Sequence, residues 1–325
     1  MSPVDGLLVL DKPAGCTSHD VVARCRRTYG QKKVGHAGTL DPDATGVLLV
    51  GLGQATRLLQ YLSGLPKRYT AEVVLGVATS TLDAMGAVTG MWDMTGVTLE
   101  AARAAALSLT GQISQVPPMV SALKVGGRRL HELARAGIEV ERAARPVTVS
   151  RFDLKLAPVT GRGPGDRADV ELEVAAAGGA GPVLAIDVEC SSGTYVRSLA
   201  ADLGAGLGGG AHLRCLRRLA VGSYGVEEAV SLEALEALPE PARMVLQPVE
   251  ALRGMARVTV TGDLAAAVGH GRPLPLGALR EQGAEGPGPW AVLSGQGALI
   301  AVYQAHGPQQ TKPSVVLSQA APAAK

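Results

Sequence analysis

The clearest hydrophobic pattern in the chain is an alternation of apolar and polar residues. In KRYTAEVVLGV, residues 67–77, the apolar side chains of Tyr69, Ala71, Val73 and Leu75 fall on every second position. A period of two is typical of a strand with one buried face. Further strands are predicted at residues 146–156, 168–174 and 185–190.

Helices are predicted where candidate capping residues flank apolar positions. TSHDVVARCRRTYG predicts a basic helix with Ser18 as its N-cap, and TLEAARAAALSLTG predicts a helix that begins after Thr98 and ends before Gly111. GTYVRSLAADLGAGLG, residues 193–208, predicts a third helix that glycines terminate. A short buried strand over Leu7–Leu10 precedes the first helix. Because strands and helices alternate irregularly, the sequence favours a mixed sheet with helices packed on it.

The pattern changes near residue 247. Beyond it the chain consists of short, turn-rich segments: MARVTVTG, GRPLPLG, WAVLSGQGALIAVYQ and KPSVVL. Short strands at close spacing predict a small β-barrel. A chain of 325 residues also exceeds the size at which single cores usually stop growing. We therefore predict two domains, residues 1–247 and 248–325.

Composition is that of a compact folded protein, with 46% hydrophobic and 18% charged residues. The net charge of +2 does not by itself indicate a polyanionic partner. The four cysteines lack CxxC spacing, which favours reduced thiols. The chain shows neither a signal-peptide pattern nor an apolar run of about 18 residues. We expect a soluble, cytoplasmic protein without a membrane segment.

The sequence contains only incomplete matches to motifs that bind metals or nucleotide cofactors. DPDATG resembles the start of a calcium loop, but counting from Asp41 the twelfth position is Leu52, where a glutamate is required. GAGLGG, residues 204–209, follows a helix and not the strand that a dinucleotide fingerprint needs. Zinc-ligand spacing and a G-x-S-x-G elbow are also absent from the sequence. We expect neither a metal nor a cofactor.

Basic residues gather in four clusters. One cluster alone is typical of a solvated surface, but four together favour a phosphate-rich partner. Their members are Arg24, Arg26, Arg27, Lys32 and Lys33; Lys67 and Arg68; Lys124, Arg128, Arg129 and Arg135; and Arg214, Arg217 and Arg218.

The densest group of candidate chemical residues is GHAGTLDPDATG, residues 35–46, directly before the apolar run VLLVGLG. Asp before Pro commonly opens a turn, so the residues alone leave Asp41 open between a turn residue and a catalytic one.

Five blocks of the sequence resemble the TruB family of tRNA pseudouridine synthases. They are GLLVLDKPAGCTSHDVV; KVGHAGTLDPDATGVLLVGLGQATRL; KRYTAEVVLG with TSTLDAMG; PPMVSALKVGGRRLHELARAG; and SSGTYVRSLAADLG with GAHLRCLRRLAVG, in the family's order over residues 5–225. The resemblance implies the α+β pseudouridine synthase fold, with a mixed and largely antiparallel sheet. The segments GRPLPLG and GALIAVY resemble a PUA domain, which implies that the tail binds RNA. Because its short strands carry no block with a candidate acid, base or nucleophile, we expect the tail to supply no chemistry.

The resemblance also implies the roles of particular residues. Asp41 would be the catalytic residue, with Arg197 beside it as a cation that favours its ionised form. Tyr69 would stack on the flipped target base, and His36 would stack in the T-loop where that base had been. The substrate-binding residues would further include Lys12, Gly35, Thr45, Lys67, Lys124, Tyr195 and Leu216.

The implied reaction converts the uridine at position 55 in the tRNA T-loop to pseudouridine. The base must be flipped from the folded loop, which costs about a few kcal/mol. Asp41 would act either as a covalent nucleophile or as a base that takes a sugar proton, and the sequence leaves both routes open. No net redox change occurs, so neither metal nor cofactor is needed.

Two other functions stay open at this stage. One is a tRNA-folding chaperone in which catalysis is secondary or absent, and the other is the guide-RNA-dependent branch of the superfamily, which works inside a protein complex. We expect no obligate protein partner. The sequence departs from the family at His131, where Tyr is common, at Ser80, where Asp is usual, and in a longer glycine-rich insertion at residues 157–182.

Overall fold

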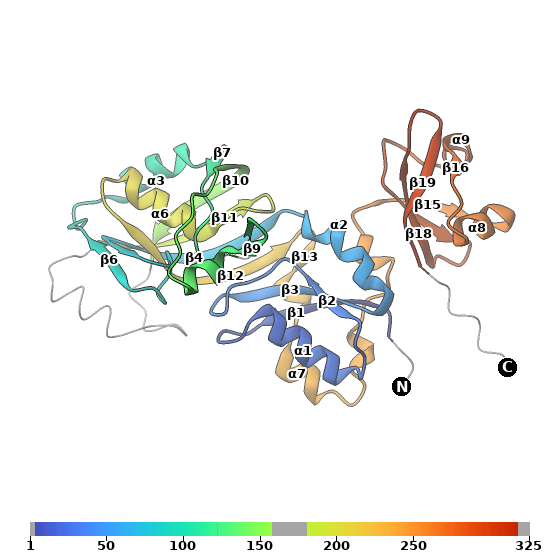
Figure 1. Cartoon of the computed structure of the whole chain (residues 1–325), viewed down its shortest axis with the longest axis horizontal. Helices are drawn as coiled ribbons and strands as arrows, with labels where there is room; N and C mark the ends of the chain where they lie inside the picture. The colour runs from blue at the N-terminus through green and yellow to red at the C-terminus, as the bar shows by residue number, and fades with distance from the viewer. Residues whose placement is uncertain (1–3, 122, 158–180, 318–325) are drawn as a thin grey trace.

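One large mixed sheet organises most of the chain (Figure 1). The computed structural model describes residues 4–121, 123–157 and 181–317. Within these residues the sheet has ten strands, and its main path is β14 (Val230–Ser231), β1 (Gly6–Lys12), β3 (Thr45–Leu52), β12 (Ala211–Val221), β4 (Lys67–Leu75), β11 (Val183–Cys190), β10 (Arg145–Leu156) and β7 (Gly111–Gln115). Two more strands pair beside this path, β2 (Val34–Ala37) with β3 and β13 (Tyr224–Gly225) with β12. Its pairs are antiparallel except β1 with β14 and β3 with β12, as the family resemblance implies.

The predicted alternation in β4 is confirmed. Tyr69, Ala71, Val73 and Leu75 are buried in one core cluster. The helices α3 (Leu99–Ser108) and α6 (Val196–Gly206) supply apolar side chains to the same cluster and so cover this face of the sheet. Thr98 caps α3 as predicted, by accepting a hydrogen bond from the backbone N–H of Ala101 at 3.2 Å.

The helix α1 (Ser18–Thr28) begins one residue earlier than predicted. Thr17, and not Ser18, is its N-cap. The Thr17 hydroxyl accepts from the Asp20 N–H, and the Asp20 carboxylate accepts from the Thr17 N–H, which is a complete capping box. Ser18 is thereby free to turn inward, where it holds the loop described below.

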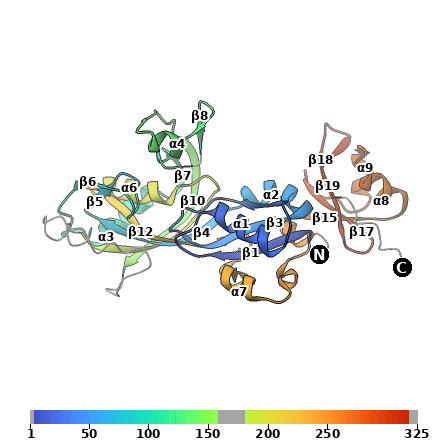
Figure 2. The same cartoon turned by 60° about the horizontal axis from the view of Figure 1, so that its bottom comes forward.

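Smaller elements surround the sheet. The helices α2 (Leu59–Ser63) and α7 (Leu232–Ala237) flank its N-terminal strands, and β5 (Val77–Thr79) forms a hairpin with β6 (Val88–Met91). Figure 2 shows a further hairpin, β8 (Lys124–Val125) with β9 (Arg128–Arg129), and α4 (Leu130–Arg135) projecting from the sheet. The predicted strand at 168–174 lies outside the described residues, and so does most of the glycine-rich insertion.

The C-terminal part, for which the sequence predicts a small β-barrel of short strands, forms a second sheet of five strands within the described residues. Its strand order is β15 (Ala256–Val260), β17 (Trp290–Ser294), β18 (Leu299–Ala305), β19 (Gln310–Val316) and β16 (Leu274–Pro275). The helices α8 (Gly262–Gly269) and α9 (Leu276–Arg280) accompany it. The sequence analysis missed both helices, because they are short and rich in alanine and glycine, and such residues give little periodic pattern.

The two sheets share one hydrophobic cluster. Leu7, Leu49 and Leu62 from the first part pack in the same cluster as Leu293 and Val302 from the second. The hydroxyls of Tyr61 and Ser314 also hydrogen-bond across this contact at 2.5 Å. The division near residue 247 stays a prediction, and Leu246 and Val249, on either side of it, both pack against this shared cluster. No helix in the described residues is long and apolar enough to cross a membrane.

Candidate active site

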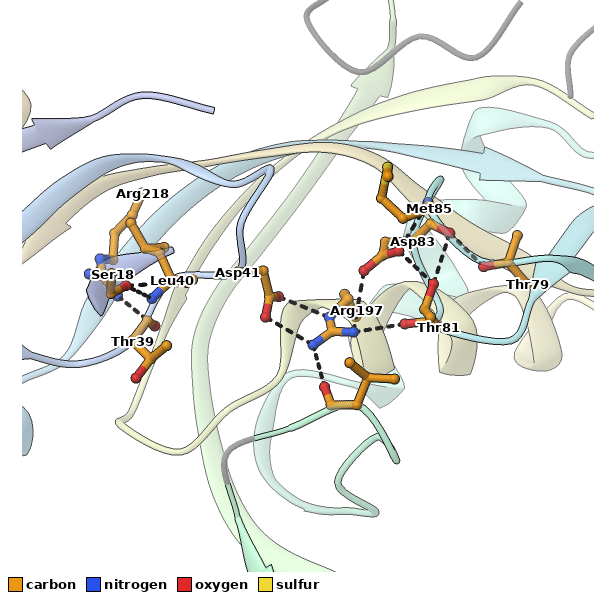
Figure 3. A network of polar contacts seen from close by, with 11 residues as sticks. Ser18, Thr39, Leu40, Asp41, Thr79, Thr81, Asp83, Met85, Arg197 and Arg218 are labelled. Atoms are coloured by element: carbon orange, nitrogen blue, oxygen red, sulfur yellow. Dashed lines mark hydrogen bonds and ion pairs between the residues drawn. The ribbon is translucent and has the colours of Figure 1, made fainter. Parts of the chain in front are cut away.

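Asp41 lies on the loop between β2 and β3 and faces Arg197 at the start of α6 (Figure 3). The Arg197 Nε and Nη2 atoms approach the two Asp41 carboxylate oxygens at 3.0 and 3.1 Å. This two-point pairing fixes the carboxylate in orientation as well as in position. The Arg197 side chain is only 5% exposed, whereas 42% of the Asp41 side chain is exposed. The carboxylate is therefore held from one side and open to a ligand from the other.

Three other groups hold the Arg197 guanidinium. It donates to the carbonyls of Thr81 and Val120 at 2.9 and 2.7 Å, and it pairs with the Asp83 carboxylate at 3.3 Å. Asp83 is itself fixed, because it accepts from the Thr81 hydroxyl at 2.6 Å. The sequence analysis gave Asp83 no role, although its block TSTLDAMG was among those that carry the family resemblance.

The pKa of Asp41 is raised above its ordinary value of 3.8. Loss of solvation on its covered side is the largest cause, and the neighbouring Asp83 carboxylate adds to it, while Arg197 acts in the opposite direction. Arg197 does favour the ionised form of Asp41, as predicted, although the net shift of the Asp41 pKa is upward. The cation is present, but desolvation and a second carboxylate outweigh it.

This balance predicts a shift in pH dependence for Asp83→Asn. Removing the second carboxylate removes a cause that raises the Asp41 pKa. We expect the acid limb of the single-turnover rate, where Asp41 becomes protonated, to move to lower pH. The matched control is Asp202→Asn on the exposed surface of α6, whose profile should coincide with that of the wild type. An acid limb that stays in place in Asp83→Asn would contradict this coupling.

Buried side chains hold the backbone of the Asp41 loop. The Ser18 hydroxyl accepts from the Leu40 N–H at 2.9 Å and lies 3.2 Å from the Leu40 carbonyl. The Lys12 ammonium donates to the Pro42 carbonyl at 2.8 Å and to the carbonyls of Pro13 and Cys16. All three Lys12 hydrogens are therefore engaged by protein. Sequence analysis assigned Lys12 to the substrate, and the contacts favour a role in holding the loop instead.

A polar hollow of about 260 Å³ opens beside Asp41. It brings together six of the predicted residues: Asp41, Tyr69 and Arg197 with Lys67, Tyr195 and Leu216. The Lys67 ammonium donates to the carbonyls of Ser63 and Leu65 at 2.6 and 2.7 Å. Burial first, and the nearby Arg218 second, lower the pKa of Lys67 to about 8. The hollow thus brings the Asp41 carboxylate and the Arg197 guanidinium together with the mostly buried Tyr69 ring.

A second, more apolar hollow of about 400 Å³ lies on the other side of the ion pair. Asp41, Arg197 and Leu216 line both hollows, while Asp83 and Met85 line only this one. Among the residues that the structure describes, no group of three or more His, Cys, Asp or Glu could hold a metal ion.

Most of the chain matches models of one known protein family. Residues 26–196 match the family described as "TruB family pseudouridylate synthase (N terminal domain)", and residues 197–253 match the "tRNA pseudouridylate synthase B C-terminal domain". The chain belongs to the TruB family.

Relatives cover this TruB-family chain almost end to end. "tRNA pseudouridine synthase B" of Mycobacterium sp. (strain KMS) is 44% identical over 97% of both chains. The protein of the same name from Rhodococcus jostii (strain RHA1) is 46% identical over 96% of this chain and 93% of its own. Among solved structures, "Crystal Structure of a Cbf5-Nop10-Gar1 Complex" matches with a TM-score of 0.68 and 25% identity, over 96% of this chain and 84% of that one. The fold that the five blocks implied is confirmed.

His36, Gly35 and Thr45 of the TruB-family chain are not among the residues that line the polar hollow. His36 and Gly35 lie on β2, where the His36 ring meets His19 edge-on at 5.7 Å. Burial, aided by His19, lowers the pKa of His36 to about 4, so its imidazole is neutral near pH 7. Thr45 lines a separate groove of about 820 Å³, and its hydroxyl accepts from Arg217 at 3.2 Å. Lys124 lies in β8, and its side chain is outside the described residues, as is that of His131.

The basic clusters contain residues in three different environments, and their contact with phosphate stays a prediction. Several members are neutralised by carboxylates: Arg24 by Glu236, Arg68 by Asp187, Arg214 by Glu72 and Arg217 by Asp11. Arg218 is buried. Lys32 and Lys33, by contrast, are exposed, and neither makes an ion pair within the described part of the chain. Charge counts along the sequence could not distinguish these cases.

Proposed function

We propose that the chain converts the T-loop uridine at position 55 of tRNA to pseudouridine. The observation that carries the proposal is the convergence of Asp41, Arg197 and Tyr69 on one polar hollow. The names of the relatives, which are tRNA pseudouridine synthases over nearly the whole length of the chain, support the same substrate class.

The geometry supplies what the isomerisation requires. The N1–C1′ bond breaks, the uracil turns, and a C5–C1′ bond forms, after which C5 loses its proton and N1, which carries none in uridine, takes one up. Asp41 meets the ribose as nucleophile or base, oriented by Arg197. Tyr69 offers its buried ring to the base, and His36, neutral near pH 7, can stack in the loop that the base has left.

The deciding experiment is tritium release from tRNA labelled as [5-³H]uridine, using the purified chain and no other component. Release from wild-type tRNA, and none from tRNA with cytidine at position 55, is expected. Tight tRNA binding without release would favour the alternative, a folding chaperone. Release only after addition of a guide RNA or partner proteins would indicate the complex-dependent mode, and we propose that no such partner is needed and that the reaction takes place in the cytoplasm.

The C-terminal sheet is proposed to extend the tRNA contact, and residues 248–325 are proposed as that domain. Support comes from its separate sheet and from the absence of a cluster like that of Asp41, Arg197 and Tyr69 among its described side chains. The C-terminal sheet would then contribute to the affinity for tRNA and not to the chemical step.

The unpaired lysines predict how binding depends on salt. If Lys32 and Lys33 contact phosphates, Lys32→Gln with Lys33→Gln should flatten the plot of log Kd against log salt by about 1.4 to 1.8 units of slope. The control is Arg24→Gln from the same cluster, whose charge already pairs with Glu236; its slope should match the wild type. Filter binding over a salt series gives both slopes, and parallel lines for all three proteins would exclude this surface from the contact.

A further inference from the structure

Arg218 occupies the centre of the large sheet. Its residue on β12 lies opposite Tyr69 on β4 and opposite Gly46 on β3. The side chain is 1% exposed, so it cannot serve the phosphate contact that its basic cluster suggested. Burying a cation away from water costs several kcal/mol unless other groups compensate. The groups that compensate for the burial of this cation indicate the role of Arg218.

The guanidinium of Arg218 donates its hydrogen bonds to backbone carbonyls. Within the described residues it forms no ion pair with a carboxylate. Its Nε donates to the Val47 carbonyl at 2.7 Å, and its Nη2 donates to the Gly38 carbonyl at 3.0 Å. A longer contact of 3.5 Å joins Nη1 to the Thr39 carbonyl. These carbonyls flank Asp41 in the chain, two before it and one in the strand that follows.

Arg218 also interacts with Tyr69, the aromatic residue of the site. It interacts with the Tyr69 phenol, and its charge opposes the rise that burial causes in the pKa of Tyr69. Arg218, Tyr69 and Asp41 line the same polar hollow. One rigid guanidinium therefore contacts both the ring that would hold the base and the loop that carries the carboxylate.

The backbone around Arg218 leaves little freedom to move. A Cβ at Gly46 would lie 2.1 Å from the Arg218 carbonyl oxygen, and Gly46 has a φ of +104°. Only glycine allows β3 and β12 to approach this closely. The strand that bears Arg218 is thus locked against the strand that follows Asp41.

From these contacts we propose that Arg218 is a positioning residue that sets the distance between the Tyr69 ring and the Asp41 carboxylate. It does not meet the substrate's reacting atoms. Its effect should appear in the chemical step and not in tRNA binding, because the bound uridine would lie misplaced against Asp41. The proposal goes beyond the function proposed above and uses the same reaction as its readout.

The test compares Arg218→Met and Arg218→Lys with Arg68→Met. Arg68 is the matched control, an arginine on the neighbouring strand whose charge pairs with Asp187 on the other face of the sheet. For Arg218→Met we expect kcat to fall by about 100-fold, which is the scale of a misplacement of about 1 Å, with KM and the tRNA Kd little changed. A lysine at position 218 can reach only some of the carbonyls that Arg218 contacts. The kcat of Arg218→Lys should therefore lie between that of Arg218→Met and that of the wild type. Arg68→Met should retain wild-type kcat.

Circular dichroism and thermal unfolding must accompany the kinetics. If Arg218→Met does not fold, Arg218→Lys decides, since it keeps the charge and much of the volume. A folded Arg218→Lys with wild-type kcat, a loss confined to KM, or failure of both variants to fold would each overturn the proposal. Absence of turnover in the wild type would instead refute the proposed function.

Discussion

Asp41→Asn is expected to reduce turnover below detection while the Kd for tRNA stays within a few-fold of the wild type. The amide keeps the shape of the carboxylate, but it can act neither as a nucleophile nor as a base. It also loses the charge that Arg197 meets at two points. Tritium release under single-turnover conditions measures the reaction, and filter binding measures the affinity.

Asp43→Asn provides the matched control for this variant. Asp43 stands two residues further along the same loop and lines the apolar hollow, but it is not among the residues that line the polar one. Its replacement should reduce the rate by less than about tenfold, or about 1.4 kcal/mol in transition-state stabilisation. If Asp43→Asn were the inactive variant, or if Asp41→Asn turned over near the wild-type rate, the assignment of Asp41 would be wrong.

Arg197→Lys is expected to slow the chemical step by about 100- to 1000-fold, the scale seen when one preorganised donor is lost from an active site. A lysine keeps the charge, but it cannot pair with Asp41 at two points while also reaching Asp83, Thr81 and Val120. The carboxylate should then adopt several orientations in the bound complex. Single-turnover rates test this expectation at saturating enzyme.

The control for Arg197→Lys is Arg68→Lys, which alters an ion pair of a half-exposed arginine on the outer face of the sheet. Such pairs contribute about 1 kcal/mol or less, so both stability and rate should change little. Thermal unfolding separates a misplaced carboxylate from a damaged fold. A rate for Arg197→Lys equal to that of Arg68→Lys would show that two-point pairing with Asp41 is dispensable.

Local sequence patterns were sufficient to predict the elements that bury one face. The alternation in β4 and the Thr98 cap of α3 both follow from residues within a few positions of each other. The start of α1 was misjudged because Thr17 and Ser18 are equally good caps by residue type. Only the contact between Ser18 and Leu40, 22 residues away, shows which of the two turns inward.

The site itself depends on contacts that no local pattern contains. The Arg197–Asp41 bond spans 156 positions, and the Arg217–Asp11 bond spans 206. A basic residue in the sequence has the same appearance whether it meets a carboxylate, a backbone carbonyl or water. For this reason Arg218 received no role in the site from the sequence, while Arg217 was assigned to phosphate although it pairs with Asp11. Asp83 was missed because its partner Arg197 lies far from it in the sequence.

The hydrophobic cluster shared by the two sheets has a consequence for how the chain can evolve and be recombined. Leu62 of α2 and Val302 of β18 pack in one core although they lie in different parts of the chain, so a change of volume on one side must be matched on the other. The two parts are therefore constrained to vary together. A chimera that takes its C-terminal sheet from a relative would pack this shared cluster poorly, unless the facing side chains of α2 and β3 were transferred with the sheet.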